Sequence, residues 1–234
     1  MAELKEILKN YNINVTEKQL TQFDIYYEFL MTENEKYNLT AIKEKDEVLY
    51  KHFLDSILPY QTFKEGLKVI DIGTGAGFPS IPLAILRPDL KFTLVDSVEK
   101  KTNFVFNLAD KLGLSNVEVY HARCEDLAKE IKFREQYDYV VARAVAPLTS
   151  LLEYCVPFIK VGGIFIAYKG TNYNQEVENT KKTTKLLNIR QVQILKYNIK
   201  EINTERYCIV YEKTGITDKK YPRGQNKPRL KPLN

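Results

Sequence analysis

Three glycines alternate with other residues directly after a carboxylate, in the run Asp71-Ile72-Gly73-Thr74-Gly75-Ala76-Gly77-Phe78. Glycine has no Cβ and tolerates positive φ, so such a loop between a strand and a helix lets a ligand approach the backbone closely. A dinucleotide-binding loop follows Gly-x-Gly-x-x-Gly, which requires glycine where Phe78 stands, or at Ser80 if the pattern begins at Gly75. Both positions break the pattern. The loop therefore favours a cofactor without a pyrophosphate.

S-adenosylmethionine fits such a loop, because it carries an α-amino group and a sulfonium and has no phosphate. We expect Asp71 to hold its ammonium group, directly or through water, while the backbone of Gly73, Gly75 and Gly77 lines the amino-acid part. Asp96 ends the next predicted strand, and a carboxylate at that place accepts hydrogen bonds from the ribose hydroxyls. The alternative is that each aspartate caps the helix that follows its strand.

Cys124 and Glu125 follow the third predicted strand, where the chain passes the adenine ring. A polar side chain or a backbone amide there can bind the adenine edge, with Phe78 or Cys124 as apolar cover. The three cysteines, which include Cys155 and Cys208, form no CxxC pair. We therefore expect reduced thiols and no metal site.

The elements that must position these residues alternate between short apolar strands and helices. This alternation predicts an α/β fold with a mostly parallel seven-stranded sheet, an antiparallel edge hairpin and an N-terminal helical cap. Together with the glycine loop, it indicates the class I Rossmann-like methyltransferase type. The expected strands cover 68–72, 92–95, 117–121, 139–142, 164–168, 191–197 and 206–212, and the expected helices 80–86, 98–112, 148–158 and 174–187. We expect one globular unit with a helical cap over 1–64, the methyltransferase domain over 65–218 and a basic extended tail over 219–234.

Composition bounds the class of protein. The chain has 234 residues, of which 44% are hydrophobic and 28% charged, a balance typical of soluble globular proteins. No apolar run approaches the ~18 residues of a membrane span, and the N-terminus lacks the layout of a signal peptide. We therefore expect a cytoplasmic protein, without a membrane partner and monomeric.

The excess positive charge lies near the C-terminus, where the segment 219–234 holds six basic residues and no acidic one, while the rest of the chain is nearly neutral. One interpretation is a solvated, disordered terminus. The other is an arm that contacts phosphates, kept extended by its prolines. On that interpretation the candidate RNA contacts in the tail are Arg223, Lys227, Arg229 and Lys231.

Motifs along nearly the whole chain resemble one family. They include Tyr37-Asn38-Leu39-Thr40, His52 with Asp55-Ser56, the glycine loop, Leu94-Val95-Asp96-Ser97, Arg123-Cys124-Glu125, Arg143-Ala144, Lys169-Gly170, Arg206 and Tyr221-Pro222-Arg223. The chain resembles the bacterial 16S rRNA guanine-N7 methyltransferases called RsmG, formerly GidB. The resemblance implies a small-subunit rRNA or a ribosomal subunit precursor as partner. It also implies cofactor contacts from Gly73, Phe78, Cys124, Glu125 and Arg143, with Asp96 and Ser97 at the ribose.

The segment after the fourth predicted strand bears on the reaction. It reads Ala142-Arg143-Ala144-Val145-Ala146-Pro147, without the Asp/Asn-Pro-Pro-Tyr type of motif common in exocyclic amine methylation. Guanine N7 carries a lone pair and no proton, so its methylation needs no general base and rests mainly on positioning. We expect Arg143 and Lys169 to hold the guanine edge or a flanking phosphate, surface ion pairing being the alternative. Arg206 is a further candidate RNA contact, and His52 either contacts RNA or is satisfied within its helix.

The leading hypothesis is therefore S-adenosylmethionine-dependent methylation of guanine N7 in small-subunit rRNA. An oxidoreductase on the same sheet is disfavoured by Phe78 and Ser80 in the glycine pattern. A non-catalytic RNA-binding protein that keeps the fold is another alternative. So is a methyltransferase with a different RNA or a small-molecule acceptor, for which the basic tail has no evident purpose.

Overall fold

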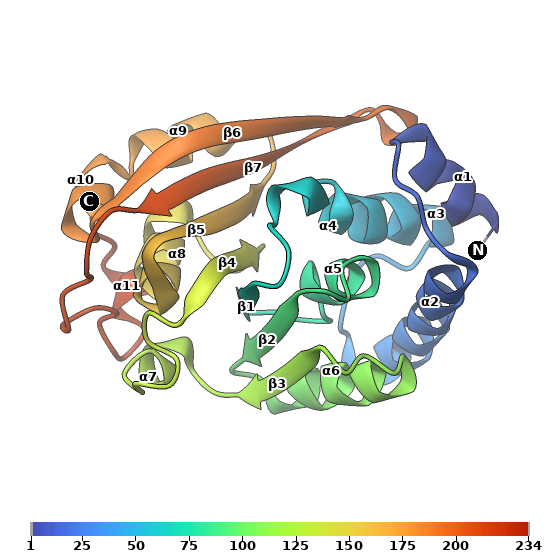
Figure 1. The fold of residues 1–234 in the computed structure, drawn as a ribbon, viewed down its shortest axis with the longest axis horizontal. Coiled ribbons are helices and arrows are strands. Elements are labelled where there is room, and N and C mark those ends of the chain that lie inside the picture. The colour runs from blue at the N-terminus through green and yellow to red at the C-terminus, as the bar shows by residue number, and fades with distance from the viewer. Residues whose placement is uncertain (1, 234) are drawn as a thin grey trace.

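A seven-stranded sheet in the order β3-β2-β1-β4-β5-β7-β6 organises the chain. It is seen in a computed structural model that describes residues 2–233 (Figure 1). Strands β1 to β5 pair in parallel, whereas β7 is antiparallel to both β5 and β6. The strands are β1 (Lys68–Ile72), β2 (Lys91–Asp96), β3 (Val117–His121), β4 (Tyr137–Arg143), β5 (Ile159–Lys169), β6 (Ile189–Ile199) and β7 (Thr204–Lys213). This confirms the predicted Rossmann-like class with its antiparallel edge hairpin.

Helices cover both faces of the sheet (Figure 1). The α-helices are α1 (Ala2–Asn10), α2 (Glu17–Tyr37), α3 (Lys45–Glu47), α4 (Asp55–Ile57), α5 (Ser80–Leu86), α6 (Glu99–Lys111), α7 (Cys124–Leu127), α8 (Leu148–Cys155), α9 (Tyr173–Glu178), α10 (Lys181–Leu186) and α11 (Lys227–Leu230). A π-helix spans Val48–Leu54, and short 3₁₀ turns span Tyr60–Thr62, Val156–Phe158 and Lys200–Ile202. Among the described residues, no helix has both the length and the apolar character to span a membrane.

Two clusters of buried side chains hold these layers together. Alternate residues of a strand point to opposite faces, so Val69 and Val141 join the cluster under α1, α2, α5 and α6. Their neighbours Ile70 and Val140 join the cluster under α7 and α8. The strand order reverses between β1 and β4, and in such sheets ligands bind in the crevice outside the carboxyl ends of the strands at that point.

The N-terminal helices are fastened to the glycine loop and to α5. A capping box lies at the start of α2, where the side chains of Thr16 and Gln19 each accept a hydrogen bond from the other residue's backbone N–H. The Gln19 side chain also donates to the carbonyl of Ile85, at 2.9 Å. Farther along α2, the Tyr26 hydroxyl donates to the carbonyl of Ala76 inside the loop, at 2.6 Å. The cap therefore fixes the loop in place.

Two predicted elements differ from the observed ones because of local residues. The expected helix 148–158 leaves α-helical geometry after Cys155, where the 3₁₀ turn that follows contains Pro157, which cannot donate a backbone hydrogen bond. The expected helix 174–187 is split into α9 and α10 around Thr180, whose hydroxyl bonds back to the carbonyl of Val177, at 2.7 Å.

The expectation of an extended tail over 219–234 is wrong for its described part, residues 219–233. Tyr221 is only 5% exposed, and the guanidinium of Arg134 donates to three backbone carbonyls between residues 217 and 221. Arg223 forms a two-pronged ion pair with the fully buried carboxylate of Glu153, at 2.7 and 2.8 Å. The segment then turns into α11, which packs against α8. The charge pattern of the tail did not reveal this packing because Glu153, the partner of Arg223, lies 70 residues away in the sequence.

Candidate active site

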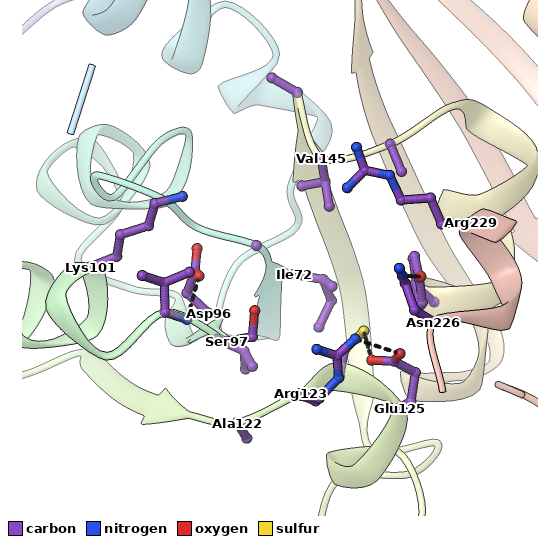
Figure 2. A pocket seen from close by; sticks show the side chains of 17 residues that line it. Ile72, Asp96, Ser97, Lys101, Ala122, Arg123, Glu125, Val145, Asn226 and Arg229 are labelled. Carbon is purple, nitrogen blue, oxygen red and sulfur yellow. Dashed lines mark hydrogen bonds and ion pairs between the residues drawn. The ribbon is translucent and has the colours of Figure 1, made fainter. Parts of the chain in front are cut away.

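A cavity of about 370 Å³ opens at the carboxyl ends of β1, β2, β3 and β4 (Figure 2). This size lies within the ~300–1,000 Å³ of small-molecule sites. Five of the predicted cofactor residues line it: Gly73, Asp96, Ser97, Cys124 and Glu125. The other predicted cofactor residues, Asp71, Gly75, Gly77, Phe78 and Arg143, do not line this cavity.

Asp96 braces the glycine loop while it lines the cavity. Its Oδ2 accepts a hydrogen bond from the backbone N–H of Gly75 at 3.0 Å, and its Oδ1 accepts from Val98 at 3.0 Å. The second contact resembles the helix-capping alternative, since α6 begins one residue later. A carboxylate oxygen has more than one lone pair, so these contacts leave acceptor capacity toward the cavity for two ribose hydroxyls.

Different structural features require glycine at different positions of the loop. All three have positive φ, between +61° and +94°. A Cβ on Gly73 would lie 2.6 Å from Cγ2 of Val145, and one on Gly77 would lie 2.7 Å from Cγ1 of Ile81. Gly73 therefore permits the loop after β4 to close over this cavity, whereas Gly77 permits the start of α5 to pack against the glycine loop.

Asp71 lies under the loop, fully buried. Neither carboxylate oxygen has a hydrogen-bond partner, nor do the hydroxyls of Thr74 and Ser80 beside it. Burial raises the pKa of Asp71 to about 7, although the nearby hydroxyls and the charge of Arg143 oppose the rise. A buried carboxylate without a partner is costly and is relieved by a cationic ligand. The unpartnered carboxylate therefore fits S-adenosylmethionine, whose ammonium would supply that charge.

Residues around the start of α7 form the part of the cavity where the sequence predicted contacts with adenine. The buried Glu125 accepts from Arg123 at 3.2 Å and from the Cys124 thiol at 3.4 Å. Tyr154 of α8 and Asn226 also line the cavity, and their side chains are joined by a hydrogen bond of 2.9 Å. Sequence reasoning gave neither Tyr154 nor Asn226 a role in the site, because no motif marks them.

All three cysteines are free. Burial raises the pKa of the Cys124, Cys155 and Cys208 thiols well above the usual range, so none supplies the thiolate that methylation of a pyrimidine carbon requires. Within residues 2–233, no group of three or more His, Cys, Asp or Glu side chains could hold a metal ion.

A second pocket, of about 340 Å³, adjoins the first and shares Ala144 with it. It brings together Arg143, Lys169 and Arg206, which are far apart in the sequence and were predicted separately as substrate contacts. Ala144 has φ +57°, a region that costs a non-glycine residue of order 1–3 kcal/mol and is most often found at functional sites. This turn directs Arg143 to the second pocket and Val145 to the first.

One carboxylate serves two arginines in the second pocket. Asp55 accepts from Arg143 at 2.8 Å and pairs with Arg206 at 3.3 Å, so the pair of guanidiniums keeps an excess of positive charge. Lys169 is instead paired with Glu176 at 2.6 Å and donates to a backbone carbonyl at 3.1 Å. The ion-pairing alternative therefore describes Lys169 more fully than it describes the two arginines.

His52 is satisfied within the protein. Arginine can only donate, so Nδ1 of His52 accepts from Arg143 at 3.2 Å, and its Nε2–H donates to the hydroxyl of Thr40 at 2.8 Å. Burial and the charge of Arg143 lower the pKa of His52 to about 3. The ring stacks on Phe78 with 4.4 Å between centroids. Phe78 thus packs against His52 and Arg143 of the second pocket, whereas sequence reasoning considered it as cover for adenine.

Solved structures share this fold. A SAM-dependent methyltransferase from Aquifex aeolicus superposes with a TM-score of 0.55 at 18% identity, covering 73% of this chain and 94% of that one. The M. jannaschii protein TYW2, solved in complex with AdoMet, also gives 0.55, at 15% identity over 74% of this chain and 79% of that one. The fold is that of a Rossmann-like methyltransferase.

Sequence comparison gives the family. Residues 19–205 match the model described as rRNA small subunit methyltransferase G. A protein of Bacillus cytotoxicus named "Ribosomal RNA small subunit methyltransferase G" is 45% identical over 235 residues, covering 100% of this chain and 98% of that protein. A protein of the same name from Lactobacillus acidophilus is 44% identical, covering 97% and 96%. The chain belongs to the rRNA small subunit methyltransferase G family and is an S-adenosylmethionine-dependent methyltransferase.

Proposed function

We propose that this chain methylates N7 of a guanosine in small-subunit (16S) ribosomal RNA, without a general base. The observation that carries the proposal is the pair of adjoining pockets, one beside the glycine loop and one rich in cations, joined at Ala144. The names of its relatives, which refer to the small ribosomal subunit, support the same substrate.

Each of the two pockets binds a different ligand. S-adenosylmethionine, when bound, supplies an electrophilic methyl group. Gly73 and Asp96 hold the cofactor in the first pocket, and Arg143 and Arg206 hold the nucleotide in the second. An arginine can donate to O6 of guanine or to a phosphate. The shared wall at Ala144 lets the two ligands approach each other.

No residue in the second pocket is set up to remove a proton. Both ring nitrogens of His52 are engaged, and its pKa of about 3 makes it a weak base. Asp55 is occupied by two arginines. Guanine N7 has no proton to lose, so positioning and electrostatics are sufficient for this acceptor. The same site would serve an exocyclic amine poorly.

The wider setting follows from the substrate. We place the reaction in the cytoplasm, on rRNA or a ribosomal subunit precursor, with the chain acting as a monomer. Lys227 and Lys231 are exposed cations close to the first pocket's C-terminal wall, and we propose that they contact RNA phosphates there. The cap, methyltransferase domain and C-terminal segment act as one unit, because the cap contacts the glycine loop and the segment contacts α8.

Transfer of labelled methyl groups from S-adenosylmethionine to purified 16S rRNA, 23S rRNA and small subunits tests this function. We expect label in small-subunit RNA, mapped as N7-methylguanosine. Arg143→Ala should abolish most of the transfer, while Arg190→Ala, at an exposed arginine of the edge strand β6, should leave it unchanged. Label at another atom, or full turnover of Arg143→Ala, would contradict the proposal. A complete lack of label with intact cofactor binding would favour the non-catalytic alternative.

A further inference from the structure

The C-terminal segment 221–233 is part of the cofactor cavity and not only a neighbour of it. Asn226 and Arg229 line the cavity, opposite Asp96 and Lys101 in Figure 2. The segment is fixed in this position by several contacts. Arg223, at the start of the segment, forms an ion pair with Glu153. Farther along, the carbonyl of Pro228 accepts a hydrogen bond from the buried hydroxyl of Ser150 at 2.8 Å.

Arg229 has no partner for its charge within the described chain. No described carboxylate lies within 4.0 Å of its guanidinium, in contrast to Arg123, Arg143 and Arg223, which are all ion-paired. Its side chain extends to the Val145 side of the cavity, whereas Asn226 lies on the Glu125 side (Figure 2). Val145 covers Gly73, the part of the glycine loop that faces the cavity.

S-adenosylmethionine carries one anionic group, the carboxylate of its amino-acid part. Under the proposed function the nucleoside occupies the part of the cavity between Asp96 and Glu125, and Figure 2 places Lys101 beside Asp96. An anionic group at the opposite end would meet Arg229. A guanidinium binds a carboxylate with charge-assisted, often bidentate hydrogen bonds.

We propose that Arg229, held in place by the folded C-terminal segment, binds the carboxylate of S-adenosylmethionine and so selects for the complete amino-acid part of the cofactor. This inference rests on the placement of the cofactor in the first pocket under the proposed function. It assigns to Arg229 a role in cofactor binding in place of the RNA contact suggested by the sequence.

Calorimetric titration with two ligands tests the proposal. S-adenosylhomocysteine contains the carboxylate, and 5′-methylthioadenosine lacks the whole amino-acid part. We expect Arg229→Ala to lower the affinity for S-adenosylhomocysteine about 10-fold and to leave the affinity for 5′-methylthioadenosine unchanged. Arg229→Lys should recover part of the lost affinity. Lys227→Ala and Lys231→Ala, at exposed cations of the same segment that do not line the cavity, are matched controls and should bind both ligands normally.

Two results would overturn the inference. One is an unchanged affinity of Arg229→Ala for S-adenosylhomocysteine, in particular if its affinity for rRNA falls instead, which would assign the residue to the RNA backbone. The other is an equal loss for both ligands. Asp96→Asn distinguishes a failure of the inference about Arg229 from a failure of the proposed function, since this variant should bind both ligands less tightly. If it weakens neither, the cofactor does not occupy this pocket, and both proposals fail.

Discussion

Replacing Asp71 by asparagine is expected to stabilise the folded chain above neutral pH while weakening cofactor binding. The Asp71 carboxylate is fully buried, and neither of its oxygens has a hydrogen-bond partner. Burial raises its pKa from 3.8 to about 7. Between these two values the folded chain holds a proton that the unfolded chain has released, so the free energy of unfolding falls as the pH rises. Asparagine has almost the same shape and does not ionise.

The size of the effect follows from the shift in pKa. Each unit corresponds to about 1.4 kcal/mol, so a shift of roughly three units removes about 4 kcal/mol from the folded protein once the pH exceeds 7. From pH 5 to pH 8 the difference between Asp71→Asn and the parent should change by about 3 kcal/mol in favour of the variant. An ammonium ligand offsets this cost in the parent, so S-adenosylhomocysteine should bind the variant less tightly.

Urea unfolding at pH 5 and pH 8, without cofactor, measures the change, and Asp110→Asn at an exposed carboxylate serves as the matched control. The control should follow the parent at both pH values. If Asp71→Asn also follows the parent, the buried carboxylate is not under strain, and the argument that it awaits a cationic ligand is refuted. An affinity for S-adenosylhomocysteine equal to that of the parent would refute the argument independently.

Three further changes probe the second pocket and the C-terminal segment. Asp55→Ala removes the carboxylate shared by two arginines and should lower kcat/KM for rRNA about 30-fold, or about 2 kcal/mol. A parallel loss of affinity for S-adenosylhomocysteine in calorimetry would contradict the separation of the two pockets. Glu153→Gln leaves Arg223 without its buried partner and should reduce the free energy of unfolding by about 3 kcal/mol in urea titrations; a loss below about 1 kcal/mol would show that the ion pair does not fasten the segment. His52 has a pKa of about 3 against 6.5 when unfolded, so folded stability should fall as the pH drops below 6.5, and His52→Gln should reduce that slope in thermal melts at pH 5 and 7.

Local sequence patterns predicted most of the elements that hold the cofactor. Short, nearly continuous apolar runs predicted the parallel strands, and the end of a strand indicated where Asp96 and Arg143 lie. The glycine loop was recognisable because positive φ at Gly73 and Gly77 leaves few other residues possible. Each of these features depends on a handful of consecutive residues.

The features that sequence did not predict depend on contacts between distant residues. The basic tail looked solvated because Glu153, its buried counter-charge, lies in an otherwise apolar helix. Asp55 carried a family motif but no assigned role, since its two arginine partners come from β4 and β7. Arg229 was grouped with the other tail cations by charge, whereas its position relative to the cavity depends on the fold of the segment. The folding together of residues that are far apart in the sequence decided these three cases.

The folded C-terminal segment has a consequence for biosynthesis. The residues that line the first pocket range from Ile72 to Arg229, so a nascent chain that has completed the glycine loop and all seven strands still has an open cofactor cavity. Because domains fold as their residues emerge from the ribosome, the pocket closes only when the segment beyond residue 220 is released and can reach α8. The wall formed by Asn226 and Arg229 is thus the part of the first pocket that is added last during synthesis of the residues that line it.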